Sequence, residues 1–252
     1  MTNKVAITGI GIISSIGDEI NTVTKSLFES KTGLSLVENF DSIYSKIYPC
    51  GEIKISSIDL AKSLQINKSN FSRSSLLGAY AARQAISDSK INDLNKYRTG
   101  FISSTSVAGM DITEKYFNNF EIDDCKNYVE NNNPGDITSQ IVDFINFTGF
   151  TSTISTACSS SANAILFGMK LINSNYLDRV IVGGTDCLTK FTLNGFRSLM
   201  ILSDEECKPF DHNRKGLNLG EGAGYLVMES EKILANEKKE IYAYIEGGAN
   251  IN

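Results

Sequence analysis

The sequence predicts an α/β fold in which helices cover a β-sheet in layers. Two observations support this prediction. Short β-rich runs alternate with segments of helical spacing along the chain, and 41% of the 252 residues are apolar, which is enough to build a buried core. No linker, low-complexity tract or repeat divides the chain, so we expect one domain over residues 1–252.

The first half of the chain shows this alternation twice. A β-rich run bounded by glycine lies at 5–9, and Ile20, Val23 and Leu27 have the spacing of one helix face over 19–30. Small and apolar residues predict a helix over 71–89, and a β-type run follows at 100–103. The region 112–133 is polar and rich in asparagine, which indicates an excursion from the core before a helix-like segment over 137–147.

The second half continues the pattern. A β-rich run at 151–156 leads into a predicted helix over 159–173, and a strand is predicted at 179–183. Two further β-rich runs, at 224–229 and 241–246, are separated by a charged segment. Strands that alternate with helices over the whole length are typical of a layered α/β protein.

Composition excludes several classes of partner and site. The formal charge is −5 and no long basic cluster occurs, so neither nucleic acid nor an anionic membrane is an expected partner. Five cysteines at irregular spacing, without a CxxC pair, indicate free thiols in a reducing compartment and no metal site. Glycines interrupt the apolar start, and no stretch reaches the roughly 20 apolar residues of a membrane span, so we expect a cytoplasmic protein. We expect no cofactor.

Cys158 is the candidate nucleophile. It follows a β-rich run and stands where the predicted helix over 159–173 begins. The helix dipole and the free N–H groups of the first turn favour negative charge there, so they should stabilise a thiolate and contribute to an oxyanion hole. The neighbours from Thr156 to Ser161 are small, which leaves room for an acyl thioester. Most free cysteines are simply buried core residues. We accept that interpretation for the remaining ones, which are Cys50, Cys125, Cys187 and Cys207.

A second stretch, over 208–229, holds four glycines around Asp211, Arg214 and Glu221. A phosphate-binding loop is one interpretation, but the stretch lacks the GK[ST] ending and does not open a helix. We therefore interpret it as a structural loop, in which Asp211 and Arg214 pair with each other or with the backbone.

Four motifs occur in a specific order: VAITGIG near the start, TACSSS around Cys158, VGGTD at 182–186 and PFD..R.G...GEGAG at 209–224. Together they resemble the β-ketoacyl-(acyl-carrier-protein) synthases. The resemblance runs along the whole chain. It implies a thiolase-like fold, of which the chain matches the amino-terminal half, a layered α/β/α arrangement with a mixed sheet.

The resemblance also implies an activity. In that family the residue matching Cys158 takes an acyl group from acyl carrier protein. Decarboxylative condensation with a malonyl unit follows, in fatty acid or polyketide biosynthesis, so the chain is expected to be an acyltransferase of the 3-oxoacyl synthase type. Val107 and Phe196 match positions that shape the entrance and wall of the acyl pocket, and ordinary core packing is an equally good interpretation of both. The run before Cys158 and the stretch 186–194 match parts near the family's homodimer contact.

The sequence also departs from the family. Relatives are longer and carry two catalytic histidines in a carboxy-terminal half, whereas His212 is the only histidine here and lies in the PFDHNR loop. Three interpretations stay open: a subunit whose other half is a separate chain, the amino-terminal portion of a longer enzyme, or a non-catalytic acyl-carrier-binding or dimerisation module. A thiolase-type enzyme is a further alternative, which the PFD..R.G...GEGAG stretch disfavours. We expect acyl carrier protein as a partner and either a homo-oligomer or a heterodimer with a chain that carries the carboxy-terminal half.

Overall fold

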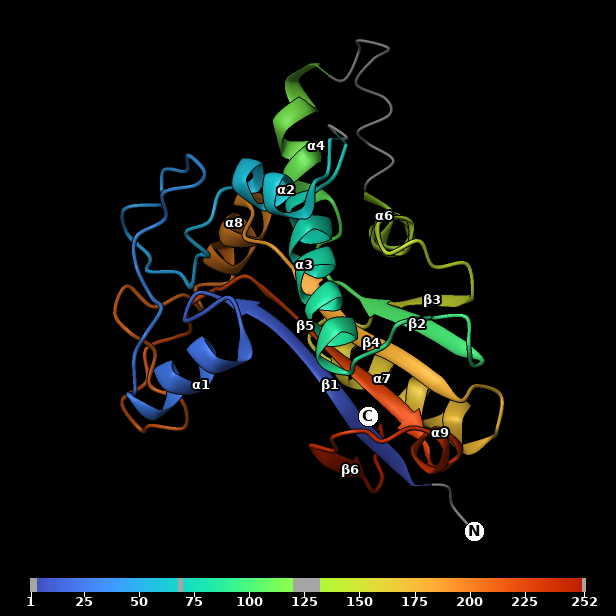
Figure 1. The fold of residues 1–252 in the computed structure, drawn as a ribbon. Coiled ribbons are helices and arrows are strands. Elements are labelled where there is room, and N and C mark those ends of the chain that lie inside the picture. Colours follow the sequence, from blue (N-terminus) through green and yellow to red (C-terminus); the bar gives the residue numbers. More distant parts are fainter. Residues whose placement is uncertain (1–3, 68–69, 120–131, 251–252) are drawn as a thin grey trace.

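A computed structural model describes residues 4–67, 70–119 and 132–250 (Figure 1). Its six-stranded mixed sheet has the order β3-β2-β4-β5-β1-β6. Strands β3, β2 and β4 are parallel to one another, and β5, β1 and β6 continue the sheet in antiparallel pairs. The strands are β1 (Val5–Ser14), β2 (Thr99–Ser104), β3 (Phe150–Ile154), β4 (Arg179–Asp186), β5 (Gly222–Ser230) and β6 (Ala243–Ile245).

Helices cover both faces of this sheet. α3 (Arg73–Asp88) packs on β1, β5 and β4, and α7 (Ser160–Asn173) packs on β4, β2, β3 and β5. β4 shows that the two helices lie on opposite faces, because Ile181 belongs to the apolar cluster around α3 whereas Val180 and Val182 belong to the cluster around α7. The result is an α/β/α arrangement, as the sequence predicted (Figure 1).

Close contact between α3 and β1 depends on glycine. A Cβ atom on Gly11 would lie 1.9 Å from the carbonyl oxygen of Ala81, and one on Gly9 would lie 2.4 Å from that of Ala85. Only a residue without a side chain allows the helix backbone to come so close. The same glycines that interrupt the apolar start of the sequence therefore set the distance between helix and sheet.

The predicted elements are found, with shifted ends. The strand predicted at 5–9 extends to Ser14, and the helices predicted over 19–30, 71–89, 137–147 and 159–173 are present. The polar excursion predicted at 112–133 begins with helical residues, and 120–131 lie outside the described residues. The remaining elements are α1 (Ile20–Phe28), α2 (Ser57–Leu64), α4 (Met110–Tyr116), η1 (Phe117–Asn119), α6 (Pro134–Phe144), α8 (Lys190–Ser198) and α9 (Glu231–Asn236).

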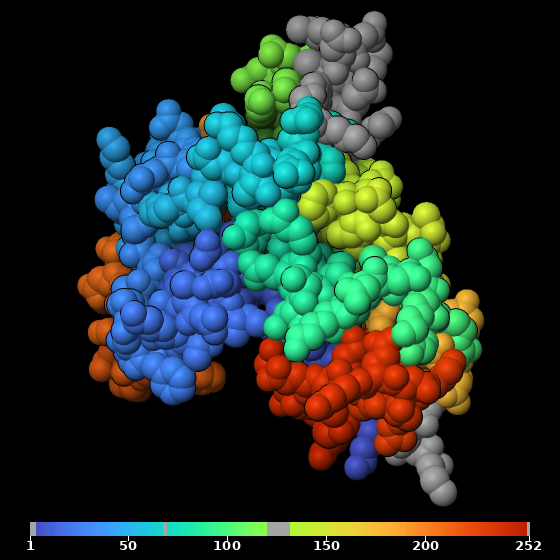
Figure 2. Space-filling view, viewed as in Figure 1, coloured from blue at the N-terminus to red at the C-terminus, as the bar shows by residue number. Residues whose placement is uncertain are grey.

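The surface on the α3 side is hollowed between two parts of the chain. The carboxy-terminal segment, red in Figure 2, lies below α3, and the segment that contains α1, blue in the same view, lies beside α3. The groove between them is lined by α3 residues such as Tyr80 and Gln84 and by Tyr242. Among the described helices, none combines the length and the apolar character that a membrane span requires.

Candidate active site at the strand ends

Three sequence-predicted residues lie near one edge of the sheet. Since β3, β2 and β4 are parallel, their carboxyl ends meet at the same edge, which is where open α/β sheets commonly bind ligands. Cys158 lies on the turn after β3 and Val107 on the turn after β2. Phe196 lies on α8, which follows β4 and packs against α4.

The turn that carries Cys158 is tightly hydrogen-bonded. Ala157 has a positive φ of 52°, which is uncommon for a residue with a side chain. The hydroxyl of Ser160 donates to the carbonyl of Ala157 (2.6 Å) and accepts from the backbone N–H of Thr156 (2.8 Å). The backbone N–H of Ser159 donates to the carbonyl of Thr156 (3.3 Å). These contacts fix the backbone on both sides of Cys158 and turn the chain from strand into helix.

Cys158 is the exposed cysteine among the four that the structure describes. α7 begins at Ser160, with Ser159 as its N-cap, so the thiol lies just before the first helical turn. The sequence predicted this position correctly. The first-turn N–H groups of a 14-residue helix are thus close to the backbone that carries the thiol.

The other described cysteines are less suited to nucleophilic chemistry. Cys50 and Cys187 are buried, as the sequence analysis expected. Burial, with the neighbouring Glu52, raises the pKa of Cys50 to about 11, and complete burial raises the pKa of Cys187. Cys207 is half-buried, and Cys125 lies outside the described residues.

Val107 and Phe196 are both half-buried. Val107 packs against the apolar cluster on the α3 side of the sheet, whereas α7 begins on the other side. The turn that carries Val107 and the turn that carries Cys158 therefore approach each other only along the sheet edge. Half-burial suits both the pocket-wall and the core interpretation, so the roles of Val107 and Phe196 stay predictions.

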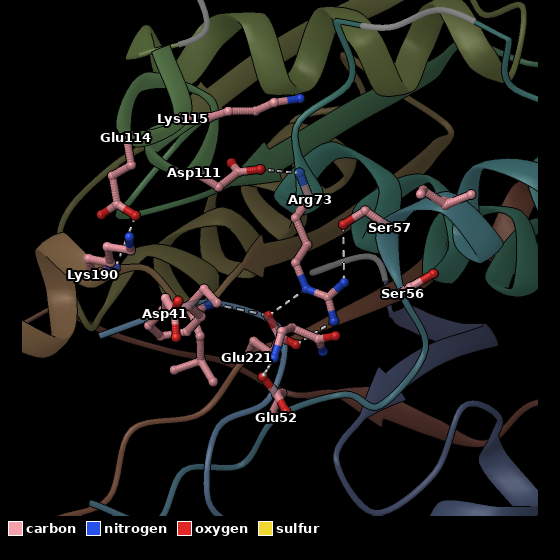
Figure 3. Close-up of a pocket in the computed structure, with 14 residues that line it drawn as sticks. Asp41, Glu52, Ser56, Ser57, Arg73, Asp111, Glu114, Lys115, Lys190 and Glu221 are labelled. Carbon is pink, nitrogen blue, oxygen red and sulfur yellow. Dashed lines mark hydrogen bonds and ion pairs between the residues drawn. The ribbon is translucent and has the colours of Figure 1, made fainter. Parts of the chain in front are cut away.

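A separate pocket lies at the start of α3. Its volume is about 420 Å³, and charged side chains dominate its lining (Figure 3). In its wall, Arg73 donates from Nε and Nη2 to the carboxylate of Glu221 at 2.8 and 2.6 Å. The same carboxylate accepts from the backbone N–H groups of Ile53 (3.0 Å) and Leu188 (3.1 Å). Because Glu221 joins three separate segments, we interpret this cluster as structural rather than catalytic.

The glycine-rich stretch is accordingly a structural loop. Glu221 of its GEGAG motif makes the contacts just described, and Arg214 donates from Nη1 to the backbone carbonyl of Asp211 (2.9 Å), as predicted. Sequence reasoning missed Arg73, since nothing near it in the chain identifies Glu221 as its partner. In the described ranges, no group of three or more His, Cys, Asp or Glu residues is placed to hold a metal ion.

Comparison with solved structures shows the class of fold. The ishigamide ketosynthase/chain length factor superposes with a TM-score of 0.87 at 24% identity, covering 98% of this chain and 63% of that one. A beta-ketoacyl synthase from Burkholderia phymatum gives a TM-score of 0.81 at 20% identity, covering 96% of this chain and 63% of that one. The fold is thus the thiolase-like fold of the ketosynthases, which confirms the predicted fold class.

Sequence comparison shows the family. The model described as "Beta-ketoacyl synthase, N-terminal domain" matches residues 2–233, so the chain belongs to the beta-ketoacyl synthase family. The 3-oxoacyl-(acyl-carrier-protein) synthase 2 of Staphylococcus aureus (strain N315) is 28% identical over 259 residues, and that of Coxiella burnetii is 26% identical over 260. Each match covers 97% of this chain and 62% of the relative. The extent of the domain beyond residue 233 stays a prediction.

Proposed function

We propose that the chain is the acyl-accepting part of a 3-oxoacyl-(acyl-carrier-protein) synthase, with Cys158 as its nucleophile. The observation that carries the proposal is the exposed thiol on a fixed turn directly before α7. The names of the curated relatives support the choice of acyl carrier protein thioesters as substrates.

The acyl-transfer step follows from this geometry. The thiolate of Cys158 attacks the thioester carbonyl, and the N–H groups at the start of α7 stabilise the negative charge on its oxygen. Collapse of this intermediate forms the new carbon–sulfur bond and breaks the bond to the carrier's thiol. The carrier's sulfur leaves with the bonding electrons and takes up the proton that Cys158 had released.

Condensation needs more than this chain's polypeptide supplies. An enolate forms when the malonyl unit loses carbon dioxide, and removing one donor from such an oxyanion typically costs about 10²–10³ in rate. In the family two histidines serve as these donors. His212 is the only histidine among the 252 residues and is exposed in the loop at 208–216. We therefore propose that the donors come from protein beyond these residues.

The proposed partners are acyl carrier protein and a protein segment or chain that packs on α7. Three of the partly buried apolar residues around α7 are Ile165, Leu166 and Phe167, which are not fully covered within the described residues. Solved relatives include a ketosynthase, ApeO, in complex with its chain length factor and a type II ketosynthase, AntDE, with its acyl-carrier protein. These assemblies support both partner types for this chain. A non-catalytic acyl-carrier-binding module stays the alternative.

The acylation proposal is tested by mass spectrometry of the purified chain after incubation with an acyl-carrier-protein thioester. We expect the acyl group on Cys158, and we expect limiting iodoacetamide to alkylate the same residue first. Cys158→Ala should abolish acylation, and Cys207→Ala, at the half-buried thiol, is the matched control that should not. Modification of another cysteine in the native protein, or carrier binding without acylation, would contradict the proposal, and the second result would favour the non-catalytic module.

The condensation proposal is tested separately. With acyl- and malonyl-carrier protein, the 252-residue polypeptide alone should give acylated Cys158 and no 3-oxoacyl product. Formation of that product by the polypeptide alone would show that the argument from the histidines is wrong.

A further inference from the structure

Asp186, the last residue of β4, binds the turn that follows β2. Its Oδ1 accepts hydrogen bonds from the hydroxyl of Thr105 (2.6 Å) and from the backbone N–H groups of Ser106 (2.8 Å) and Val107 (3.1 Å). Its Oδ2 accepts from the hydroxyl of Ser106 (2.5 Å). One carboxylate thus holds three consecutive residues, and hydrogen bonds to a charged acceptor are stronger than neutral ones.

On the side of Val107 this turn is also held by a backbone hydrogen bond from the N–H of Met110 to the carbonyl of Val107 (3.3 Å) and by the packing of Ala108 in the core, but Asp186 is the charged group that binds it. Thr105 Oγ1 also accepts from the backbone N–H of Ala108 (3.0 Å), whose φ is 51°. A residue with a side chain keeps such a conformation only when its surroundings enforce it. Without the carboxylate, the N–H groups of Ser106 and Val107 would lose these acceptors, and the turn could relax.

The same turn is connected to the segment that carries Cys158. The backbone N–H of Thr105 donates to the carbonyl of Ile154 at the end of β3 (3.3 Å). The hydroxyl of Ser104 shares a hydrogen bond with that of Ser161 in α7 (3.0 Å) and donates to the carbonyl of Gly183 (3.0 Å). The turn therefore crosses the sheet edge from the start of α7 toward the α3 side, where Val107 packs.

We propose that Asp186 is a positioning residue that sets the place of Val107 at the sheet edge and thereby the length of acyl chain that Cys158 accepts. The inference rests on the proposed function and on the predicted place of Val107 in the wall of the acyl pocket. The turn of Cys158 is held by its own contacts to Thr156 and Ser160. Loss of Asp186 therefore moves Val107, the predicted wall of the acyl pocket, and leaves the nucleophile in place. Long acyl chains, which must pass the wall, are affected more than short ones.

The test compares acylation of Cys158 in the full chain by hexanoyl- and palmitoyl-carrier protein. In Asp186→Ala the ratio of the two rates should change by at least about tenfold, the lower end of the effect that one methylene group has in an apolar pocket. Asp186→Asn keeps an acceptor oxygen, so it should retain the native ratio to within about twofold. Alkylation of Cys158 by iodoacetamide, a small probe, should stay within about twofold in both variants.

Asp178→Ala is the matched control. Asp178 also joins β2 to β4 through its hydrogen bonds with Arg98, but at the opposite edge of the sheet. An equal change of the ratio in this control, an unchanged ratio in Asp186→Ala, or an equal change in Asp186→Asn would overturn the inference. If Asp186→Ala does not fold, Asp186→Glu takes its place, because the longer arm keeps the charge and displaces the turn.

The two proposals can fail separately. A native chain that is acylated on Cys158 but shows the same ratio in the alanine or glutamate variant refutes the role of Asp186 alone. A native chain that is not acylated refutes the proposed function and this inference with it.

Discussion

Replacing Glu221 by alanine should destabilise the protein strongly. The side chain of Glu221 is 1% exposed and that of its partner Arg73 is 8% exposed, and their charged atoms lie 2.6 Å apart. Removing one member of a buried ion pair leaves the other charge buried without compensation, which costs about 3–5 kcal/mol in the free energy of unfolding. The backbone N–H groups of Ile53 and Leu188 also lose their acceptor.

The size of the effect depends on what remains for Arg73. Its Nη2 still donates to the carbonyl of Ile53 (2.8 Å) and its Nη1 to that of Ile55 (3.1 Å), so the guanidinium keeps neutral acceptors but loses the carboxylate that contacts it. Glu221→Gln retains one acceptor oxygen and the shape of the side chain. We expect it to cost less, about 1–3 kcal/mol.

Urea denaturation followed by circular dichroism measures both variants, and unchanged slopes would allow the midpoints to be compared directly. Glu38→Ala is the control, because Glu38 pairs with Lys54 at the surface with 73% of its side chain exposed. That control should change the free energy of unfolding by about 0–1 kcal/mol. If Glu221→Ala lowered the free energy of unfolding no more than the control, the interpretation of the Arg73–Glu221 cluster as structural would be refuted.

Two further predictions concern the sheet. A Cβ on Gly183 would lie 2.0 Å from a backbone oxygen of β5, so Gly183→Ala should cost about 3 kcal/mol or more, whereas Gly224→Ala, which meets nothing within 4 Å, should cost about 0.5 kcal/mol or less. Equal thermal denaturation of the two variants would contradict this. Hydrogen bonds from Arg98 lower the pKa of Asp178 to about 2. Since this pKa is below the unfolded value of about 4, its stabilising contribution is present above pH 4 and is lost as the pH falls toward 2. The stability gap between the native chain and Asp178→Asn should therefore shrink over that window, and a gap independent of pH would count against the assignment.

The sequence alone determined the elements whose signal is local. β1 was predicted as a β-rich run bounded by glycine, and α3 and α7 because their apolar residues recur with the period of a helix. The junction at Cys158 was predicted for the same reason, since a β-rich run, small residues and a helical pattern follow one another directly. The motif order predicted the family, which the comparison confirmed.

Tertiary structure decided what depends on residues far apart in the chain. The helix α8 was not predicted, because its sequence KFTLNGFRS mixes glycine with β-branched and aromatic residues. It forms with Thr189 as a cap and packs on α4. Arg73 pairs with Glu221, 148 positions away, and Asp186 accepts a hydrogen bond from Val107, 79 positions away. No local pattern encodes such contacts. The first arises when α3 packs beside β5, and the second when the strand order brings the carboxyl ends of β2 and β4 side by side.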